Sequence, residues 1–269
     1  MSDPVPPELA AALSESGSRR GRLGEAVVYF SEISSTNDRA SVLAERGAAE
    51  GTIVMAAAQT AGRGRLGRQW YSPPGAGLYF SIVFRTPGVA PYLTLAAGVA
   101  VATGIRSATG LPVEIKWPND VVTAGSNGPG RRRKLAGVLA EGSSSPEGLQ
   151  YVVLGIGINL GPAAYPRELA DRASSIEVEL GRPVDGWRIF GEVLAALAAE
   201  LPALERGDPS GCLRRWRALA PSASGANVEY DRPGGRVHGV ASGIADDGAL
   251  LVRVGETMDR VLAGEVIWK

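Results

Sequence analysis

The chain has 269 residues, of which 45% are hydrophobic, so it is long enough for one medium-sized domain with a real core and a small second one. Lysine plus arginine and aspartate plus glutamate both number 28, and this zero net charge argues against a dedicated nucleic-acid binder, which carries a basic excess. A single cysteine, Cys212, and a single histidine, His238, exclude an internal disulfide, a cysteine-based zinc site and a histidine-rich metal site.

The first 24 residues are rich in proline, serine and arginine, and we expect them to form a tail with at most a short helix over Glu8–Leu13. They lack a charged start followed by an apolar stretch, which is the pattern of a secretory signal. We find no run of about 18 apolar residues, so no membrane span is expected. The expected location is therefore the cytoplasm.

The next part of the chain alternates short strands with a helix. Val27–Phe30 and Thr52–Gln59 are apolar, β-rich runs that predict strands. Between them, Ser34–Asp38 is rich in helix N-cap residues, and a helix is expected over Arg39–Arg46. Leu78–Phe84 alternates apolar and other residues as a further strand does.

The middle of the chain predicts a buried helix followed by three strands. Pro91–Gly110 is apolar all round, which is typical of a helix inside a core. Pro112–Lys116 and Lys134–Glu141 are predicted strands, and the near-continuous apolar run Tyr151–Leu160 predicts a central one. Two more helices are expected after them, at Trp187–Glu205 and Cys212–Leu219.

The last 50 or so residues change character. Short β-like runs from Ala226 to Trp268 are separated by turn signals, and this spacing predicts a small antiparallel, SH3-like β-barrel. The expected organisation is a tail (1–24), a catalytic domain (25–220) and the barrel (221–269), with the boundary near Pro221. The catalytic domain is expected to be α+β, with a mixed, mainly antiparallel sheet, because the βαβ alternation of a Rossmann fold is missing.

A glycine- and arginine-rich segment between Gln59 and Trp70 carries the chemistry most plainly. Glycines allow the backbone to approach a ligand, successive backbone N–H groups can cradle an anion, and arginines add planar donors that suit phosphate. The residues are Gly62, Arg63, Gly64, Arg65, Gly67 and Arg68. The pattern is neither a P-loop nor a dinucleotide-binding fingerprint. Taken alone, a disordered Gly/Arg surface loop or an RNA-binding arginine-rich segment accounts for the pattern as well as a phosphate site does.

Three later motifs change that balance. Lys116-Trp117-Pro118-Asn119-Asp120 closes a strand, Lys134-Leu135-Ala136-Gly137 opens another, and Gly155-Ile156-Gly157-Ile158-Asn159 ends a buried one. Together with Ser35-Thr36-Asn37 and the Gly/Arg segment, in this order, they resemble biotin–protein ligases. The resemblance runs from about Glu32 to Asn159 and continues through the C-terminal β module, so it covers most of the chain.

The resemblance implies an activity and its substrates. Members of this family join biotin to ATP, which gives biotinyl-5′-AMP and pyrophosphate, and then transfer biotin to a lysine of a biotin carboxyl carrier protein domain of a carboxylase. Both steps bring anions together, so fixed cationic and N–H donors are needed. Mg²⁺ is expected to arrive with ATP, and the sequence offers no dedicated protein metal site. Monomers and homodimers both occur in the family.

The family pattern also assigns residues. Biotin contacts are expected from Ser35, Thr36, Asn37, Gln59, Arg63, Gly64, Arg65 and Lys134. Nucleotide contacts are expected from Gly62, Arg63, Arg65, Arg68, Trp70, Lys116, Asn119 and Asn159. Catalytic roles fall to Arg65, Lys116, Lys134 and Asp120, the last orienting the incoming lysine.

Plainer interpretations stand beside these assignments. Ser35–Asn37 is a common helix N-cap, and a cap can also place side chains at a ligand. Trp70 is equally a core residue, and Asn119 and Asp120 also fit an Asx turn after a proline. Asn159 can merely end a strand.

Two departures from the family pattern qualify the prediction. Only about 25 residues precede the first strand, too few for the winged helix-turn-helix domain of some members, so no specific DNA binding is expected. The connection Val121–Arg133 is longer than usual; an exposed hairpin tip is expected there, with Arg131–Arg133 as a solvated charge run rather than phosphate ligands. This insertion weakens the assignment of Lys134. The competing functions are nucleic-acid binding, through the arginine loops and the barrel, and lipoate–protein ligation, whose enzymes lack the Gly/Arg loop.

Overall fold

A computed structural model describes residues 2–125, 132–163, 165–166, 169 and 171–269. Its main body is a seven-stranded sheet with the order β1-β2-β3-β7-β6-β5-β4. The strands are β1 (Val27–Phe30), β2 (Ile53–Ala56), β3 (Gly77–Phe84), β4 (Val113–Lys116), β5 (Asp120–Thr123), β6 (Lys134–Ser145) and β7 (Gly148–Asn159). β1 and β2 pair in parallel and the remaining pairs are antiparallel, which confirms the predicted mixed, mainly antiparallel sheet.

The central strands bury different side chains on their two faces. On β7 the even-numbered residues 152 to 158 are branched aliphatics, which join the main hydrophobic core, whereas Tyr151 and Val153 join a smaller second cluster. Two glycines, Gly155 and Gly157, continue that second face. Since side chains alternate across a strand, the second face loses its bulk toward the end of β7. A hollow is therefore left beside the second cluster.

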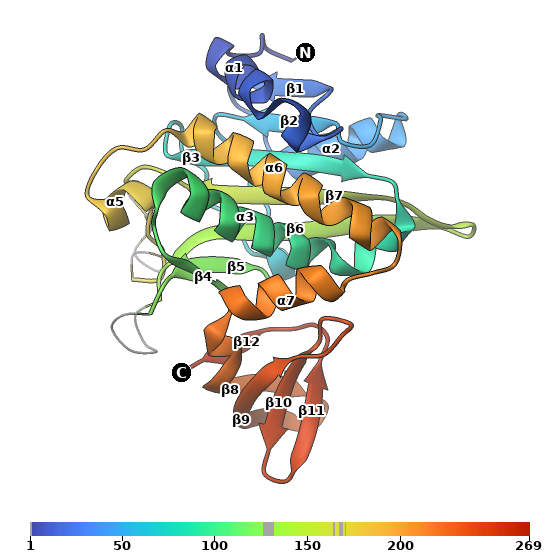
Figure 1. Ribbon diagram of the computed structural model, residues 1–269, viewed down its shortest axis with the longest axis vertical. Helices are drawn as coiled ribbons and strands as arrows, with labels where there is room; N and C mark the ends of the chain where they lie inside the picture. The colour runs from blue at the N-terminus through green and yellow to red at the C-terminus, as the bar shows by residue number, and fades with distance from the viewer. Residues whose placement is uncertain (1, 126–131, 164, 167–168, 170) are drawn as a thin grey trace.

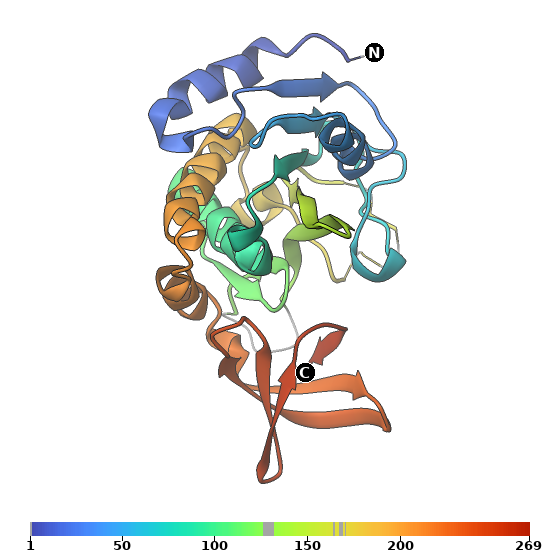
Figure 2. The same ribbon diagram turned by 90° about the vertical axis from the view of Figure 1, so that its right-hand side faces the viewer.

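Helices cover the two faces unequally (Figures 1 and 2). α3 and α6 pack together over the main core, with α1 against α6, whereas α2 packs on β2, β3 and β7 over the second face. The α-helices are α1 (Pro7–Ser16), α2 (Thr36–Glu45), α3 (Leu93–Thr109), α5 (Ile176–Leu180), α6 (Gly186–Glu205) and α7 (Ser210–Leu219). The 3₁₀ turns are η1 (Gly17–Arg20), η2 (Arg65–Gly67), η3 (Pro87–Tyr92) and η4 (Pro221–Ala223).

The segment Pro87–Thr109, which joins η3 to α3, meets the length and hydropathy criteria of a membrane-crossing helix. Within its most apolar window, 67% of the residues are buried inside the protein, and core helices meet the same criteria. α3 is therefore the buried core helix that the sequence predicted.

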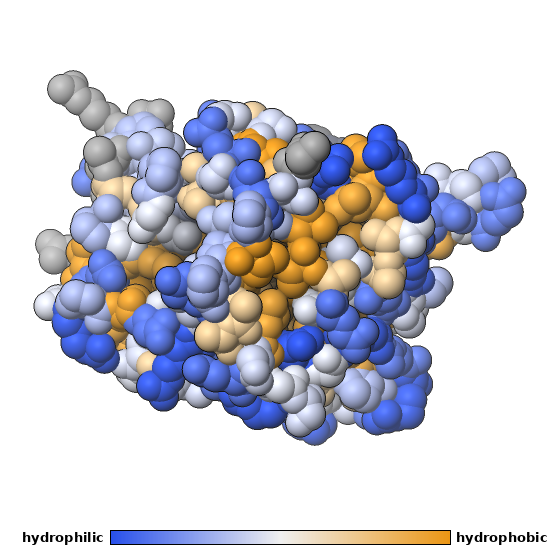
Figure 3. Space-filling model, turned by 90° about the horizontal axis from the view of Figure 1, so that it is seen from above, coloured by the Kyte–Doolittle hydropathy of each residue, from blue (hydrophilic) through white to orange (hydrophobic). Residues whose placement is uncertain are grey.

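The N-terminal segment, expected as a tail with at most a short helix over Glu8–Leu13, carries that helix as α1 and packs against the body of the domain. α1 begins at Pro7, and its Leu9 is fully buried against α6. Leu23 is also fully buried, and the Asp3 carboxylate accepts a hydrogen bond from Ser31 N (2.6 Å). A few apolar residues, namely Leu9, Ala12 and Leu23, join the core and fix the segment, and composition alone could not show where they point. The end of the molecule that carries these elements has a band of apolar side chains bordered by hydrophilic ones (Figure 3).

After Pro221 the chain forms a second, five-stranded sheet, drawn at the bottom of Figure 1. Its order is β11-β10-β9-β8-β12, with antiparallel pairing throughout and β11 and β12 at the two edges. The strands are β8 (Ser224–Arg232), β9 (Gly235–Ile244), β10 (Leu250–Val254), β11 (Thr257–Val261) and β12 (Val266–Trp268). The predicted small antiparallel module is confirmed.

Two elements were not predicted. β5 occupies the start of the connection Val121–Arg133, which sequence analysis treated as a loop, and α5 is a single short helix. β5 is only four residues long, so its alternation gave too little signal. Residues 126–131, which include the predicted hairpin tip and Arg131, lie outside the described residues. Arg132 and Arg133 form ion pairs with Glu114 (3.0 Å) and Glu179 (2.5 Å).

Candidate functional site

Three glycines form the floor of a pocket on the second face of the sheet. A Cβ atom at Gly155 would lie 2.1 Å from Asn37 Oδ1, and one at Gly157 would lie 2.5 Å from the indole of Trp70. One at Gly137, which pairs with Gly157 across β6 and β7, would lie 2.8 Å from the same indole. Any larger residue at these positions would displace the side chains that stand on the floor. Trp70 therefore lies against the glycines of the pocket, outside the hydrophobic core.

The start of α2 forms one wall of this pocket. Ser35 is the N-cap of α2, and its hydroxyl accepts a hydrogen bond from Asp38 N (3.3 Å), so the plain capping interpretation is confirmed. Gln59 Oε1 accepts from Thr36 N (2.8 Å) and from Thr36 Oγ1 (3.1 Å). The Gln59 amide donates in turn to Ser72 Oγ (2.8 Å). The cap thus fixes polar side chains at the pocket without leaving them exposed.

Asn37 extends the polar wall toward β6. It is only 4% exposed, and its Oδ1 accepts a hydrogen bond from the Ser81 hydroxyl (2.6 Å) on β3. Its Nδ2 donates to Glu141 Oε2 (2.8 Å). Both ends of the amide are satisfied, so its orientation is fixed by neighbours on two strands.

The Gly/Arg loop forms a compact turn above the floor. Gly64 N donates to Arg68 O (2.7 Å) and Trp70 N donates to Gly62 O (2.8 Å), so the two sides of the loop pair with each other. At its tip, Leu66 has a φ of 57° and is 67% exposed. This backbone pairing gives the loop a defined shape although it contributes little apolar surface to the core.

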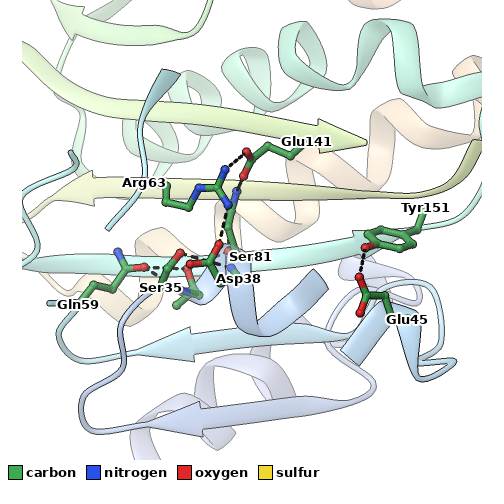
Figure 4. A network of polar contacts seen from close by, with 10 residues as sticks. Ser35, Asp38, Glu45, Gln59, Arg63, Ser81, Glu141 and Tyr151 are labelled. Carbon is green, nitrogen blue, oxygen red and sulfur yellow. Dashed lines mark hydrogen bonds and ion pairs between the residues drawn. The ribbon is translucent and has the colours of Figure 1, made fainter. Parts of the chain in front are cut away.

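Arg63 fastens the loop to the body of the domain. Its guanidinium lies between two carboxylates and donates to Asp38 Oδ1 (2.6 Å) on α2 and to Glu141 Oε1 (2.5 Å) on β6 (Figure 4). The hydrogen bond to Asp38, followed by the charge of Glu141, raises the pKa of Arg63 despite a partial loss of hydration. Both neighbours favour the charged form.

Arg65 points the other way, toward the C-terminal module. It donates to Asn119 Oδ1 (3.2 Å) and to Gly264 O (3.3 Å), and Asn119 itself donates to Val138 O (2.8 Å). Burial lowers the pKa of Arg65, and the charge of Asp120 opposes that shift. Neither partner in these hydrogen bonds is an anion, so a bound anion would be favourable for Arg65.

Lys134 lies at the far side of the pocket. Its ammonium lies 2.6 Å from Asp120 Oδ1 and 5.0 Å from the centre of the Trp70 ring. β5 and β6 lie side by side in the sheet, which explains why a lysine and an aspartate far apart in sequence meet. The insertion before Lys134 therefore does not displace it from the pocket.

Most of the predicted residues meet at one pocket, which is open to solvent and has an empty volume of about 440 Å³. Those that line it are Ser35, Thr36, Asn37, Gln59, Arg63, Gly64, Arg65, Trp70, Asn119 and Lys134. Asp120 reaches it through its ion pair with Lys134.

Besides Asp120, four predicted residues do not line it. Lys116 pairs with Asp120 across β4 and β5, and burial lowers its pKa. Arg68 forms an ion pair with Glu265 (2.5 Å) of the C-terminal module. Gly62 permits close packing inside the loop, since a Cβ there would lie 2.6 Å from Trp70 O. Asn159 donates to Ser174 O (2.9 Å), which ties the end of β7 to the following segment.

Two polar residues of the site escaped the sequence analysis. Ser81 and Glu141 both contact Asn37, yet neither belongs to a recognised motif. A period of two along β6 would have found Glu141, because it lies four residues after Gly137 and so on the same face. Ser81 pairs with Gly155 across β3 and β7, which required knowing the strand order.

The chemistry of this pocket is that of an anion site with a neutral polar end. The hydroxyl and amide groups of the α2 cap lie at one end, where the Arg63 charge is balanced by Asp38 and Glu141. Arg65 and Lys134 lie at the other end, beside Asn119 and Asp120. In the ranges that the structure describes, no three histidine, cysteine, aspartate or glutamate residues cluster as metal ligands would.

Comparisons with known proteins agree with this geometry. A model of the biotin/lipoate A/B protein ligase family matches residues 29–159, and a model of the biotin protein ligase C terminal domain matches residues 223–268. The bifunctional ligase/repressor BirA of Bacillus subtilis is 33% identical over 264 residues, which cover 94% of this chain and 78% of the relative. The biotin–[acetyl-CoA-carboxylase] ligase of Mycobacterium tuberculosis is 34% identical over 227 residues, which cover 81% of this chain and 79% of the relative.

Solved structures show the same similarity. The biotin protein ligase from Aquifex aeolicus in complex with biotin and ATP matches with a TM-score of 0.76 at 28% identity, over 91% of this chain and 99% of that one. The biotin protein ligase from Leishmania major in complex with biotin shares the fold, with a TM-score of 0.61 at 23% identity, over 90% of this chain and 99% of that one.

Proposed function

The chain belongs to the biotin–protein ligase family, and from that premise we propose how its own residues join biotin to ATP and pass it to a lysine of another protein. The observation that carries this assignment is the convergence of the α2 cap, Gln59, the Gly/Arg loop and Lys134 on one pocket. In the first step, a biotin carboxylate oxygen attacks the α-phosphorus of ATP and pyrophosphate leaves. In the second step, an acceptor amine attacks the acyl carbon, AMP leaves, and the amine loses a proton.

The neutral end of the pocket suits the ureido ring of biotin. That ring carries one carbonyl and two N–H groups, so it needs both donors and acceptors. Ser35, Thr36 and Gln59 supply both kinds of group from a rigid wall. We propose that Asn37 contacts biotin at the same end, and that the flat faces of the ligand lie against the glycine floor.

The cationic end suits the reacting anions. Arg65 and Lys134 are placed to share the negative charge that builds up when the carboxylate meets the α-phosphate. Trp70 and Asn119 are assigned to the nucleotide side, since both line the pocket beside those cations. Mg²⁺ is expected to enter as a partner of the ATP phosphates. Gly62, Arg68, Lys116 and Asn159 would reach the nucleotide only if the pocket walls rearranged around it.

Pyrophosphate exchange into ATP tests the assignment directly, because it reports the first step without an acceptor protein. We expect exchange that depends on biotin and that lipoate does not support. Exchange that ignores biotin, or that requires lipoate, would contradict the proposal.

Replacing Arg65 by alanine is expected to slow adenylation by about 10²–10³-fold, since one positively charged donor to the developing charge is lost. The melting temperature should change little, because both hydrogen-bond partners of Arg65 are uncharged and can be rehydrated. Biotin-dependent exchange and thermal unfolding measure the two effects. Normal pyrophosphate exchange in this variant would show that Arg65 has no role in adenylation.

For Asp120→Asn we expect a smaller and different effect. The carboxylate faces Lys134 and can orient an incoming ammonium group, so transfer should slow by about tenfold while adenylate formation changes less. Single-turnover experiments with preformed adenylate and a biotin carboxyl carrier domain separate the two steps. An equal loss in both steps would show that Asp120 acts only by holding Lys134.

The protein substrate is proposed to be a biotin carboxyl carrier domain of a carboxylase, in line with the acetyl-CoA-carboxylase ligase named among the relatives. A cytoplasmic location, the absence of specific DNA binding and a monomeric or homodimeric state remain predictions. Filter binding with duplex DNA and sedimentation of the purified chain address the last two.

A further inference from the structure

Glu141 lies at the junction of the Gly/Arg loop and the pocket wall. It stands on the pocket face of β6, and its two carboxylate oxygens have different partners. Oε1 accepts from Arg63 Nη2 (2.5 Å) in the loop, and Oε2 accepts from Asn37 Nδ2 (2.8 Å) in the wall. One side chain thus connects a surface loop to a side chain that is 4% exposed.

The wall side of this connection is rigid. Asn37 stands on Gly155, where a Cβ atom would lie 2.1 Å from its Oδ1, so Asn37 cannot sink toward the sheet. Ser81 donates to the same oxygen (2.6 Å), which leaves Nδ2 facing Glu141. The Asn37 amide, to which the Glu141 carboxylate is hydrogen-bonded, is therefore held in a fixed position.

The loop side depends on charge. Arg63 leaves the loop with about half of its side chain exposed, and it is held by carboxylates from two elements, Asp38 on α2 and Glu141 on β6 (Figure 4). Two carboxylates around one guanidinium oppose its release into solvent more than either alone. In this arrangement the fork of Arg63 is occupied, which leaves Arg65 as the loop arginine that faces the anion.

We propose that Glu141 is a positioning residue that holds the Gly/Arg loop closed over the pocket through Arg63 and thereby sets the affinity for biotin. This inference rests on the proposed function. Its physical basis is that a loop already held in its closed position loses less conformational entropy when the ligand binds. Glu141 contacts neither substrate in this scheme, so the chemical step itself should not need it.

Glu141→Gln tests the proposal, because glutamine keeps the size and removes the charge. We expect about a fivefold rise in the dissociation constant for biotin, measured by calorimetry, with kcat for adenylation at saturating biotin within about twofold of the parent. Trypsin should also cut at the loop arginines several times faster in the absence of ligand, since the variant retains every cleavage site. An unchanged biotin affinity together with an unchanged cleavage rate would overturn the proposal.

Glu45→Gln is a matched control. Glu45 is a carboxylate on the same face of the molecule, where it accepts from Tyr151 Oη (3.3 Å) and has no contact with the loop (Figure 4). This variant should match the parent in biotin affinity, loop cleavage and melting temperature. If Glu45→Gln weakened biotin binding as much as Glu141→Gln, the cause would be the general loss of a negative charge, and the proposal would be contradicted.

A double-mutant cycle shows whether Glu141 acts through Arg63. Arg63→Met should weaken biotin binding by itself, and adding Glu141→Gln to it should then change the affinity little. Additive losses would mean that Glu141 acts only through Asn37, which would overturn the loop assignment. If the parent protein itself fails to bind biotin, the proposed function fails first, whereas the trypsin comparison still reports on the loop.

Discussion

Lys134→Met is expected to lower biotin-dependent pyrophosphate exchange by about 10²–10³-fold, as large an effect as that expected for Arg65→Ala. Lys134 lines the pocket with 31% of its side chain exposed, so its charge is only partly screened by water. Methionine keeps most of the aliphatic stem that lies beside Trp70 and removes the ammonium. Exchange kinetics measure the loss, and thermal unfolding shows whether the fold is retained.

Two companion variants make this result specific. The chain has three lysines, and Lys269 pairs with Glu229 in the C-terminal module, so Lys269→Met should leave exchange unchanged. Lys134→Met also leaves Asp120 without its partner, and a bare carboxylate could itself repel the phosphates. Adding Asp120→Asn removes that repulsion. Restored exchange in the double variant would show that the loss came from Asp120 and that the ammonium of Lys134 is dispensable.

Gly157→Ala is expected to produce the second large effect, through shape alone. The new methyl group would lie 2.5 Å from the Trp70 indole, so the ring must leave the floor of the pocket. We expect a loss of about 1–3 kcal/mol in stability from overpacking, and at least about a tenfold loss in nucleotide affinity as the aromatic wall moves. Denaturant unfolding and calorimetry with ATP measure the two quantities.

Gly98→Ala provides the control for Gly157→Ala. Gly98 lies inside α3, and a Cβ atom there would lie 3.6 Å from the nearest atom of Ile115, which is an ordinary contact. Alanine is favoured over glycine within a helix, so stability should rise by up to about 1 kcal/mol. If Gly157→Ala were as well tolerated as Gly98→Ala, the close packing of Trp70 on the floor would be wrong.

The parts of the fold that sequence patterns predicted are those with a long, regular signal. The apolar run of β7 and the apolar helix α3 were both predicted within a few residues of their observed bounds. β5 was missed because four residues carry too little periodicity. α1 was underestimated because a few buried residues, Leu9 among them, decide its packing and composition does not reveal them.

The same division holds at the site. The order of the motifs was enough to predict that Ser35, Gln59 and Lys134 line one pocket. Each lies at or near the end of a helix or strand, where a ligand can reach it. Arg68 was assigned to the nucleotide, yet in the structure it faces Glu265, nearly two hundred residues away. Which of several arginines in a loop faces which carboxylate depends on tertiary placement, and local sequence carries no signal for it.

The ion pair between Lys134 and Asp120 bears on whether the enzyme acylates its own lysine. An acyl-adenylate reacts with any free amine nearby, and Lys134 would lie beside the one that this pocket makes. The Nζ atom of Lys134 lies 2.6 Å from Asp120 Oδ1, and an amine that is held by a carboxylate is a poorer nucleophile. With 25 of its 28 basic side chains arginines, which are not acylated under these conditions, the protein offers its own reactive product few targets. We therefore expect the pairing that orders the cationic end of the pocket also to limit acylation of Lys134 by the adenylate.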